Sequence, residues 1–127
     1  MNHDNHIELA IQAKNLTAPR VTPADVEAQI VSEHYFTAGM GVLGAAQWGA
    51  DRVEINGGDW SVRSSLDTLT FCVLTLQNGY VVTGESACAS MENFDAEIGR
   101  RIAREAAKNK IWPLLGYVLR ERLNQLP

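Results

Sequence analysis

The sequence predicts a single α+β domain in which an antiparallel β-hairpin, or a small sheet, packs against a long C-terminal helix. Three observations support this fold class. The chain has 127 residues, which is enough for one compact domain. Residues 69–83 hold two β-rich runs joined by Asn78-Gly79, a strong hairpin signal. Residues 94–112 repeat apolar side chains at helical spacing.

The N-terminal part predicts an arm followed by a helix. Residues 1–20 have only a modest apolar spacing and are expected to form a flexible arm, so that the domain spans 21–127. Thr22 is a good N-cap, and Pro23 suits the first position of a helix. Apolar residues at three-to-four spacing predict that this helix continues to about Phe36.

Residues 39–68 form a glycine-rich excursion in which six glycines interrupt every period. A structureless loop of this length is unusual in a small domain. We therefore expect short elements within it: a helix at 45–48 and strands at 52–55 and 60–63.

The hairpin that follows is expected to be tight. If Asn78-Gly79 form a two-residue turn, Thr75 pairs with Val82. Residues 70–76 are apolar on both faces, which predicts a strand that is covered on both sides.

The long helix is expected to begin at Ser90 or Asn93, and Pro113 is expected to kink or restart it. On a helical wheel, Glu105 and Asn109 lie at the centre of its apolar stripe. Arg101 is then the expected intrahelical partner of Glu105. The stripe itself is predicted to be Phe94, Ile98, Ile102, Ala106 and Trp112.

These polar positions have two interpretations. In the first, Glu105 and Asn109 fasten the helix to backbone groups of the sheet or to a second subunit, because a buried polar group needs a partner. In the second, they form the polar wall of a pocket together with Arg101 and Lys108, and Trp112 or Tyr80 supplies its aromatic side.

Charge is distributed unevenly along the chain. The net charge is −4, yet residues 97–127 carry seven Lys/Arg and three Asp/Glu, so that they hold +4 against −8 in the remainder. This imbalance suggests complementary surfaces that join subunits or frame one small anion. Duplex nucleic acid is disfavoured, because the total charge is negative and no groove-binding motif is present.

Motifs for catalysis, metal binding or membrane insertion are missing. There is no Walker A sequence, no G-x-S-x-G elbow and no C-x-x-C pair, and we expect neither an enzyme nor a cofactor. His3 and His6 suggest a polar tail more than a metal site. No apolar run approaches a membrane span and no signal peptide is apparent, so an intracellular location is expected. One catalytic alternative stays open, a thiol enzyme in which His34 activates Cys88.

Four segments, 69–80, 84–88, 93–101 and 109–117, together resemble a family of small tailed-phage proteins named after gene products forty-nine and sixty-six of two podoviruses. The likeness runs from about Val21 to Leu123. It implies a phage origin and expression in the cytoplasm of the infected host, without implying a reaction. More distantly, the chain resembles phage sponges that sequester nucleotide signals of bacterial immunity, in particular those acting against Thoeris.

Our leading hypothesis is a non-enzymatic, homo-oligomeric protein that sequesters a cyclic or ADP-ribose-type nucleotide. The candidate ligand-binding residues are chosen from the helical wheel of the long helix and from the predicted hairpin. They are Tyr80, Ser86, Asn93, Arg101, Arg104, Lys108, Asn109 and Trp112. The three basic residues would pair with phosphates, the asparagines would bind base or ribose, and the aromatic residues would stack. The alternative is a protein–protein inhibitor or adaptor of a host factor that uses Trp48 and Trp60.

Overall fold

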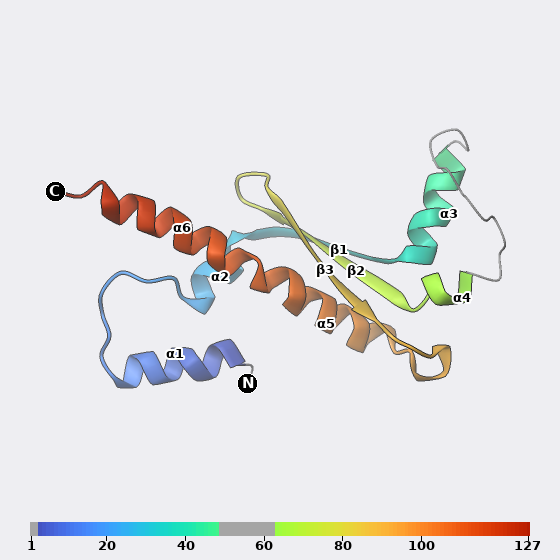
Figure 1. The fold of residues 1–127 in the computed structure, drawn as a ribbon, viewed down its shortest axis with the longest axis horizontal. Coiled ribbons are helices and arrows are strands. Elements are labelled where there is room, and N and C mark those ends of the chain that lie inside the picture. Colours follow the sequence, from blue (N-terminus) through green and yellow to red (C-terminus); the bar gives the residue numbers. More distant parts are fainter. Residues whose placement is uncertain (1–2, 49–62) are drawn as a thin grey trace.

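The computed structural model describes residues 3–48 and 63–127 and confirms the α+β class (Figure 1). Three antiparallel strands form one sheet in the order β1-β2-β3. The elements in chain order are α1 His3–Ala13, α2 Pro23–Gln29, β1 Ile30–Thr37, α3 Ala38–Trp48, α4 Arg63–Leu66, β2 Leu69–Leu76, β3 Val81–Ala87, the 3₁₀ helix η3 Met91–Asn93, α5 Ala96–Asn109 and α6 Ile111–Asn124.

The helix predicted after the arm begins where expected but is much shorter. The Thr22 hydroxyl accepts a hydrogen bond from the Asp25 amide at 3.1 Å, and the Asp25 carboxylate accepts one from the Thr22 amide at 2.9 Å. This capping box confirms the predicted start. The prediction that the helix reaches Phe36 is wrong, because the backbone turns extended at Ile30 and the chain continues as β1. The β-branched and aromatic residues of that segment pair with β2 instead.

The hairpin forms where predicted, with a turn one residue longer than expected. The Leu76 amide donates to the Tyr80 carbonyl at 2.8 Å, and Gly79 has φ of +88°. This is a three-residue loop whose last position needs left-handed backbone, which glycine adopts without strain. The added residue shifts the register, so that Val82 pairs with Leu74 and faces α5 instead of pairing with Thr75.

The core lies between α5 and one face of the sheet. Alternate residues of β2 are buried there, and α5 packs across β2 and β3 (Figure 1). The fully or nearly buried apolar residues are Val26, Cys72, Leu74, Leu76, Val82, Ala103, Ala107 and Ile111. The opposite face of β2 is only half-buried within the described part of the chain, although the sequence predicts that both faces are covered.

The remaining predictions about elements are confirmed in part. The arm contains helix α1, and a helix covers 38–48, longer than the predicted 45–48. The strands predicted at 52–55 and 60–63 fall almost wholly outside the described residues. The long helix breaks at Lys110, which leaves Pro113 in the first turn of α6. Among the described helices, none combines the length and the apolar character that crossing a membrane requires.

Candidate functional site

The eight candidate ligand-binding residues do not converge on one place in the chain. Tyr80 lies beside the hairpin turn, whereas Ser86 pairs with Thr70 near the other end of the sheet. Ser86 follows Tyr80 by six positions of extended chain, which is about 20 Å. Asn93 closes the 3₁₀ helix, and the other five candidates follow one another along α5 and the start of α6.

The buried face of α5 is not the face that the wheel predicted. Ile98 and Ile102 are 54% and 52% exposed, and Asn109 also points to solvent. The face against the sheet consists of the small residues Gly99, Ala103 and Ala107. The predicted stripe is therefore wrong for its two isoleucines, and Glu105 and Asn109 are not buried polar groups.

Gly84 on β3 explains this choice of face. A Cβ atom at Gly84 would lie 2.1 Å from the Ala103 carbonyl oxygen and 2.4 Å from the Ala107 nitrogen. Strand and helix backbones are thus in direct contact, and only small side chains fit on the helix face between them. Isoleucine at these positions would push the helix away from the sheet.

Arg104 joins α5 to α2 and β1 through two carboxylates. Its guanidinium donates to Glu27 at 2.9 and 3.0 Å and to Glu33 at 2.9 Å. These hydrogen bonds lower the pKa of both Glu27 and Glu33, and the same carboxylates raise the pKa of Arg104. Glu33 also accepts a hydrogen bond from the Tyr35 hydroxyl at 2.7 Å. Arg104 is therefore already neutralised within the chain.

Lys108 is the most buried cation of the predicted set and lies among three carboxylates. Its side chain is 5% exposed, with its Nζ 3.4 Å from both Glu27 and Glu105 and 4.0 Å from Asp4. Trp112 donates from Nε1 to the same Asp4 carboxylate at 3.3 Å. Glu105 thus pairs with Lys108, and the predicted pair of Glu105 with Arg101 is not found.

Sequence analysis missed the acidic partners of these cations. Asp4, Glu27 and Glu33 come from α1, α2 and β1, far from α5 in the chain. The one signal that pointed to them was the charge imbalance between the two parts of the sequence. Some of these opposite charges therefore pair within a single chain, where the N-terminal elements contact α5.

Arg101 differs from the two basic residues that follow it. It is exposed on α5, and no carboxylate partner is found for it in residues 3–48 and 63–127. Ile98, one turn back, is exposed next to Arg101 on the helix surface, and Ile102 is exposed next to Ile98, one turn after it. A free guanidinium beside apolar side chains is suited to a ligand that carries both a phosphate and a flat ring.

The alternative thiol site is not assembled. Cys88 lies beside Thr68, whereas His34 pairs with Val73, which is five residues or about 16 Å further along the strand. Cys88 donates from Sγ to the Ser90 carbonyl at 3.1 Å, and both cysteines are free. Cys72 is fully buried, and this burial raises the pKa of its thiol.

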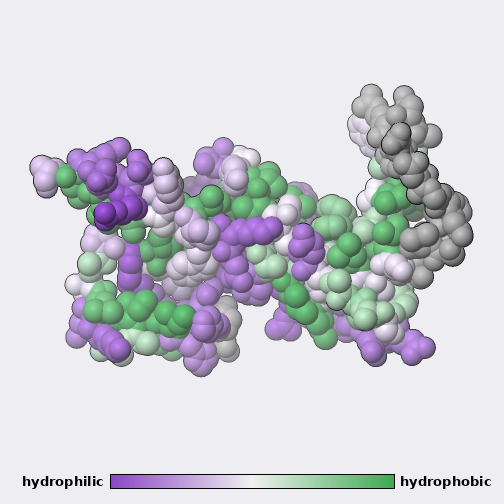
Figure 2. All heavy atoms as spheres, viewed as in Figure 1, coloured by the Kyte–Doolittle hydropathy of each residue, from purple (hydrophilic) through white to green (hydrophobic). Residues whose placement is uncertain are grey.

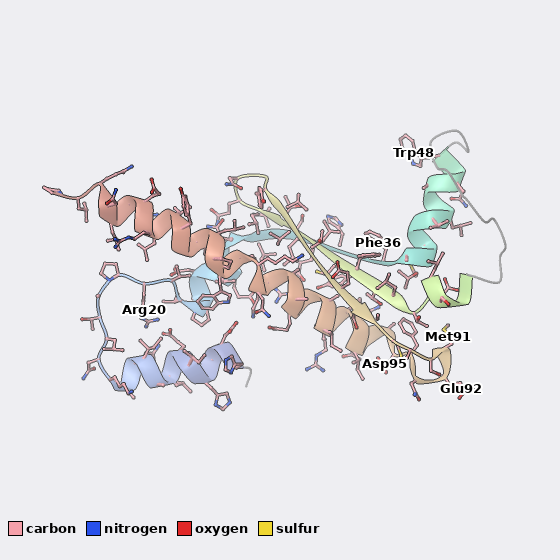
Figure 3. All side chains as sticks on the ribbon, in the orientation of Figure 1. Arg20, Phe36, Trp48, Met91, Glu92 and Asp95 are labelled. Atoms are coloured by element: carbon pink, nitrogen blue, oxygen red, sulfur yellow. The ribbon has the colours of Figure 1, made fainter. Side chains whose placement is uncertain are left out.

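Neither the hollow near Arg20 nor a metal-ligand cluster adds a site within the described residues. A hollow of about 440 Å³ lies between the end of α1 and the start of α2, where Figure 3 shows Arg20, and no candidate residue lines it. No group of three or more His, Cys, Asp or Glu side chains in this part of the chain is placed to hold a metal ion.

Comparisons with known proteins identify a family but no individual relative. No curated protein and no solved structure matches the chain. One family model matches residues 21–123, from the linker before α2 to the last turn of α6. This match includes the whole sheet, Arg101, and Arg104 with its partners Glu27 and Glu33, and leaves α1 outside. Because it spans most of the chain, the protein belongs to the Phage protein (N4 Gp49/phage Sf6 gene 66) family.

Proposed function

We propose that this phage protein acts in the host cytoplasm as a counter-defence protein, and that it sequesters a cyclic or ADP-ribose-type nucleotide signal without cleaving it. The ligand class comes from the sequence likeness to phage sponges. Sequestration requires tight binding and slow release but no reacting group. The proposal therefore needs an exposed cation and an apolar surface close together, and it needs no catalytic residue.

Arg101 carries this proposal. Arg104 and Lys108 have carboxylate partners, so binding a phosphate to either would compete with Glu27, Glu33 or Glu105. Arg101 has no such competitor among the described residues and can make a bidentate contact with a phosphate. In this arrangement Ile98 and Ile102 cover one face of the base or ribose.

The other candidates take roles that follow from their positions. Asn109 lies two turns after Arg101 on the exposed side of α5, about 12 Å away along the axis, and is placed to bind the second end of a nucleotide. Asn93 is exposed before the first turn of the same helix. Arg104 and Lys108 hold α5 in place, and Trp112 is held by Asp4.

Calorimetry with a panel of cyclic dinucleotides, cyclic trinucleotides and cyclic ADP-ribose isomers tests the proposal. We expect one class to bind, and Arg101→Ala to weaken its binding about 10- to 100-fold, because a charge-assisted contact contributes about 1.5–3 kcal/mol. Arg120→Ala is the matched control, since Arg120 is also exposed but lies on α6. No heat from any nucleotide at micromolar protein, or equal affinities for both variants, would contradict the proposal.

A second candidate function is supported by Trp48. This residue ends α3, is 81% exposed and projects from the body of the molecule in Figure 3. Exposed tryptophans are frequent anchors of protein interfaces, which favours an inhibitor or adaptor of a host protein. Trp60, the other predicted anchor, lies outside the described residues. Stoichiometric recovery of one host protein by the wild type, lost with Trp48→Ala, would favour this function.

A further inference from the structure

Helix α1 contacts the body of the molecule mainly through charged side chains. Its half-buried residues are Asp4, Glu8 and Ile11, which lie on one face of the helix. Ile7 and Leu9 are 47% and 51% exposed, and Figure 2 shows apolar residues along the visible side of α1. A helix that docks through an apolar face buries such side chains. Hydrogen bonds and ion pairs are therefore the main attachment of α1.

The two carboxylates of α1 lie one helix turn apart, and each meets a donor outside the helix. The Asp4 carboxylate accepts a hydrogen bond from Trp112 Nε1 at 3.3 Å and lies 4.0 Å from Lys108 Nζ. The Glu8 carboxylate accepts two hydrogen bonds from the Arg20 guanidinium. Four residues of helix separate these contacts by about 6 Å along the axis. The donors thus match the spacing of carboxylates at i and i+4 on a helix.

The segment that connects α1 to α2 makes few contacts that would oppose release of the helix. Residues 14–19 are all exposed, and Asn15 follows α1 with φ of +54°. The hollow of about 440 Å³ lies between this segment and the start of α2. Exposed backbone beside an unfilled hollow belongs to the least stable part of a fold. Arg20 stays with the body when α1 moves, because α2 begins three residues later.

Release of α1 leaves donors without the carboxylates of that helix. Arg20 loses Glu8, and the Trp112 indole loses the acceptor of its N–H group. Lys108 keeps two other carboxylates at 3.4 Å and so remains a paired cation beside the indole. The released surface therefore presents two donors about one helix turn apart, and ionised acceptors bind such donors most strongly.

We propose that Arg20, Lys108 and Trp112 form a docking site for an acidic helix of a partner protein, and that α1 fills this site as a detachable strap. We name these three residues the strap site. Helix α1 itself shows which ligand fits, a helix with two carboxylates one turn apart and no Lys or Arg. A single small anion would reach only one end of the site.

Charge selects the partner, and the linker sets the strength of the competition. Residues 97–127, which include two members of the strap site, carry a charge of +4 and therefore attract an acidic segment. The short linker keeps α1 at a high effective concentration near the site. A partner helix must displace α1, so the strap lowers the apparent affinity of the site for every competitor.

A stapled peptide with the sequence of residues 3–13 tests the site on purified full-length protein. A staple between positions 6 and 10, which are exposed in α1, keeps this short peptide helical. By fluorescence anisotropy, we expect the peptide to bind an Asp4→Asn/Glu8→Gln protein, named the opened variant, at least 10-fold more tightly than the wild type. Arg20→Gln in the opened variant should lower that affinity about 10-fold. Arg120→Ala in the opened variant is the matched control and should not change it, because Arg120 is exposed on α6.

The Trp112 indole N–H signal in heteronuclear NMR follows the strap directly, and Trp112→Phe assigns it. We expect the signal of the opened variant to differ from that of the wild type at low salt. Added salt should move the wild-type signal towards the open position, because it screens the charges that hold α1.

Three results would overturn the inference. The first is an opened variant that binds the peptide no more tightly than the wild type. The second is a peptide carrying Asp4→Asn and Glu8→Gln that binds as well as the unaltered one. The third is an indole signal that is the same in the wild type and the opened variant. All three are independent of the nucleotide proposal, since no nucleotide is present and Arg101 is not part of the strap site.

Discussion

At the scale of single residues, the ion pairs of Arg104 and Lys108 connect parts of the chain that are far apart in sequence. Glu27 and Arg104 are separated by 77 positions, and Asp4 and Trp112 by 108. Arg104 is better placed than Lys108 to contribute to stability, because its planar guanidinium contacts two carboxylates at once. Lys108 is a single charge that three carboxylates share.

We predict that Arg104→Met lowers the free energy of unfolding, and that the size of this decrease depends on pH. Methionine keeps the apolar stem but leaves Glu27 and Glu33 without this partner. Because these pairs are partly exposed, the free energy of unfolding at pH 7 should fall by only about 1 kcal/mol. Urea unfolding followed by circular dichroism measures the difference.

The sign of the pH dependence follows from the lowered pKa of Glu27 and Glu33. Their stabilisation is fully present above the unfolded-state pKa of about 4.3 and is lost as the pH falls through the lower folded-state pKa. The difference between wild type and Arg104→Met should therefore shrink below about pH 4. Arg120→Met, on an exposed α6 residue, should show no such trend. A constant difference down to pH 3 would contradict the assignment.

At the scale of elements, the sequence predicted which segments form helices and strands better than it predicted how they pack. The Asn78-Gly79 signal and the helical spacing of 94–112 located the hairpin and α5, because these signals are local. The predicted length of the first helix was wrong from Ile30 onward. Pairing of this segment with β2 outweighs its short run of apolar residues at helical spacing. Local spacing contains no information about such a partner.

The buried face of α5 is a second case in which local spacing did not reveal the packing partner. The error in this face also affected the choice of candidate site residues. The largest apolar side chains, Ile98 and Ile102, suggested the core face, but contact with Gly84 selected the small residues. Small residues at four-residue spacing, Gly99, Ala103 and Ala107, were the signal that could have found it. If these small residues had been taken as the buried face, Arg101 would have been predicted to be exposed.

Two glycine substitutions should therefore have opposite effects. Gly84→Ala should lower the free energy of unfolding by about 1–3 kcal/mol, because its Cβ overlaps backbone atoms of α5 that cannot rotate away. Gly116→Ala should raise it by about 0.5–1 kcal/mol, because Gly116 lies within α6 and its Cβ would meet nothing within 4 Å. Thermal unfolding of both variants measures this. A Gly84→Ala protein as stable as the wild type would refute the backbone contact.

At the scale of the whole molecule, α1 is attached differently from the rest. It has no buried residue, and its polar contacts to the body include those of Asp4 with Lys108 and Trp112 and of Glu8 with Arg20. The elements from α2 to α6 share the buried core, and the family match covers them without α1. We infer that residues 21–127 are the folding unit and that α1 is a peripheral addition.

Removal of residues 1–20 should accordingly leave a folded domain. Arg20 and Glu8 leave together, and Lys108 keeps Glu27 and Glu105, so no buried charge loses its last partner. We expect cooperative unfolding and a loss of about 1 kcal/mol from the contacts of Asp4. If Arg101 contacts the nucleotide, the shortened chain should also bind it as tightly as the full chain does. As the control, a chain that ends at Asn109 loses α6 and the fully buried Ile111, and should not fold. A disordered 21–127 chain would show instead that α1 is part of the folding unit.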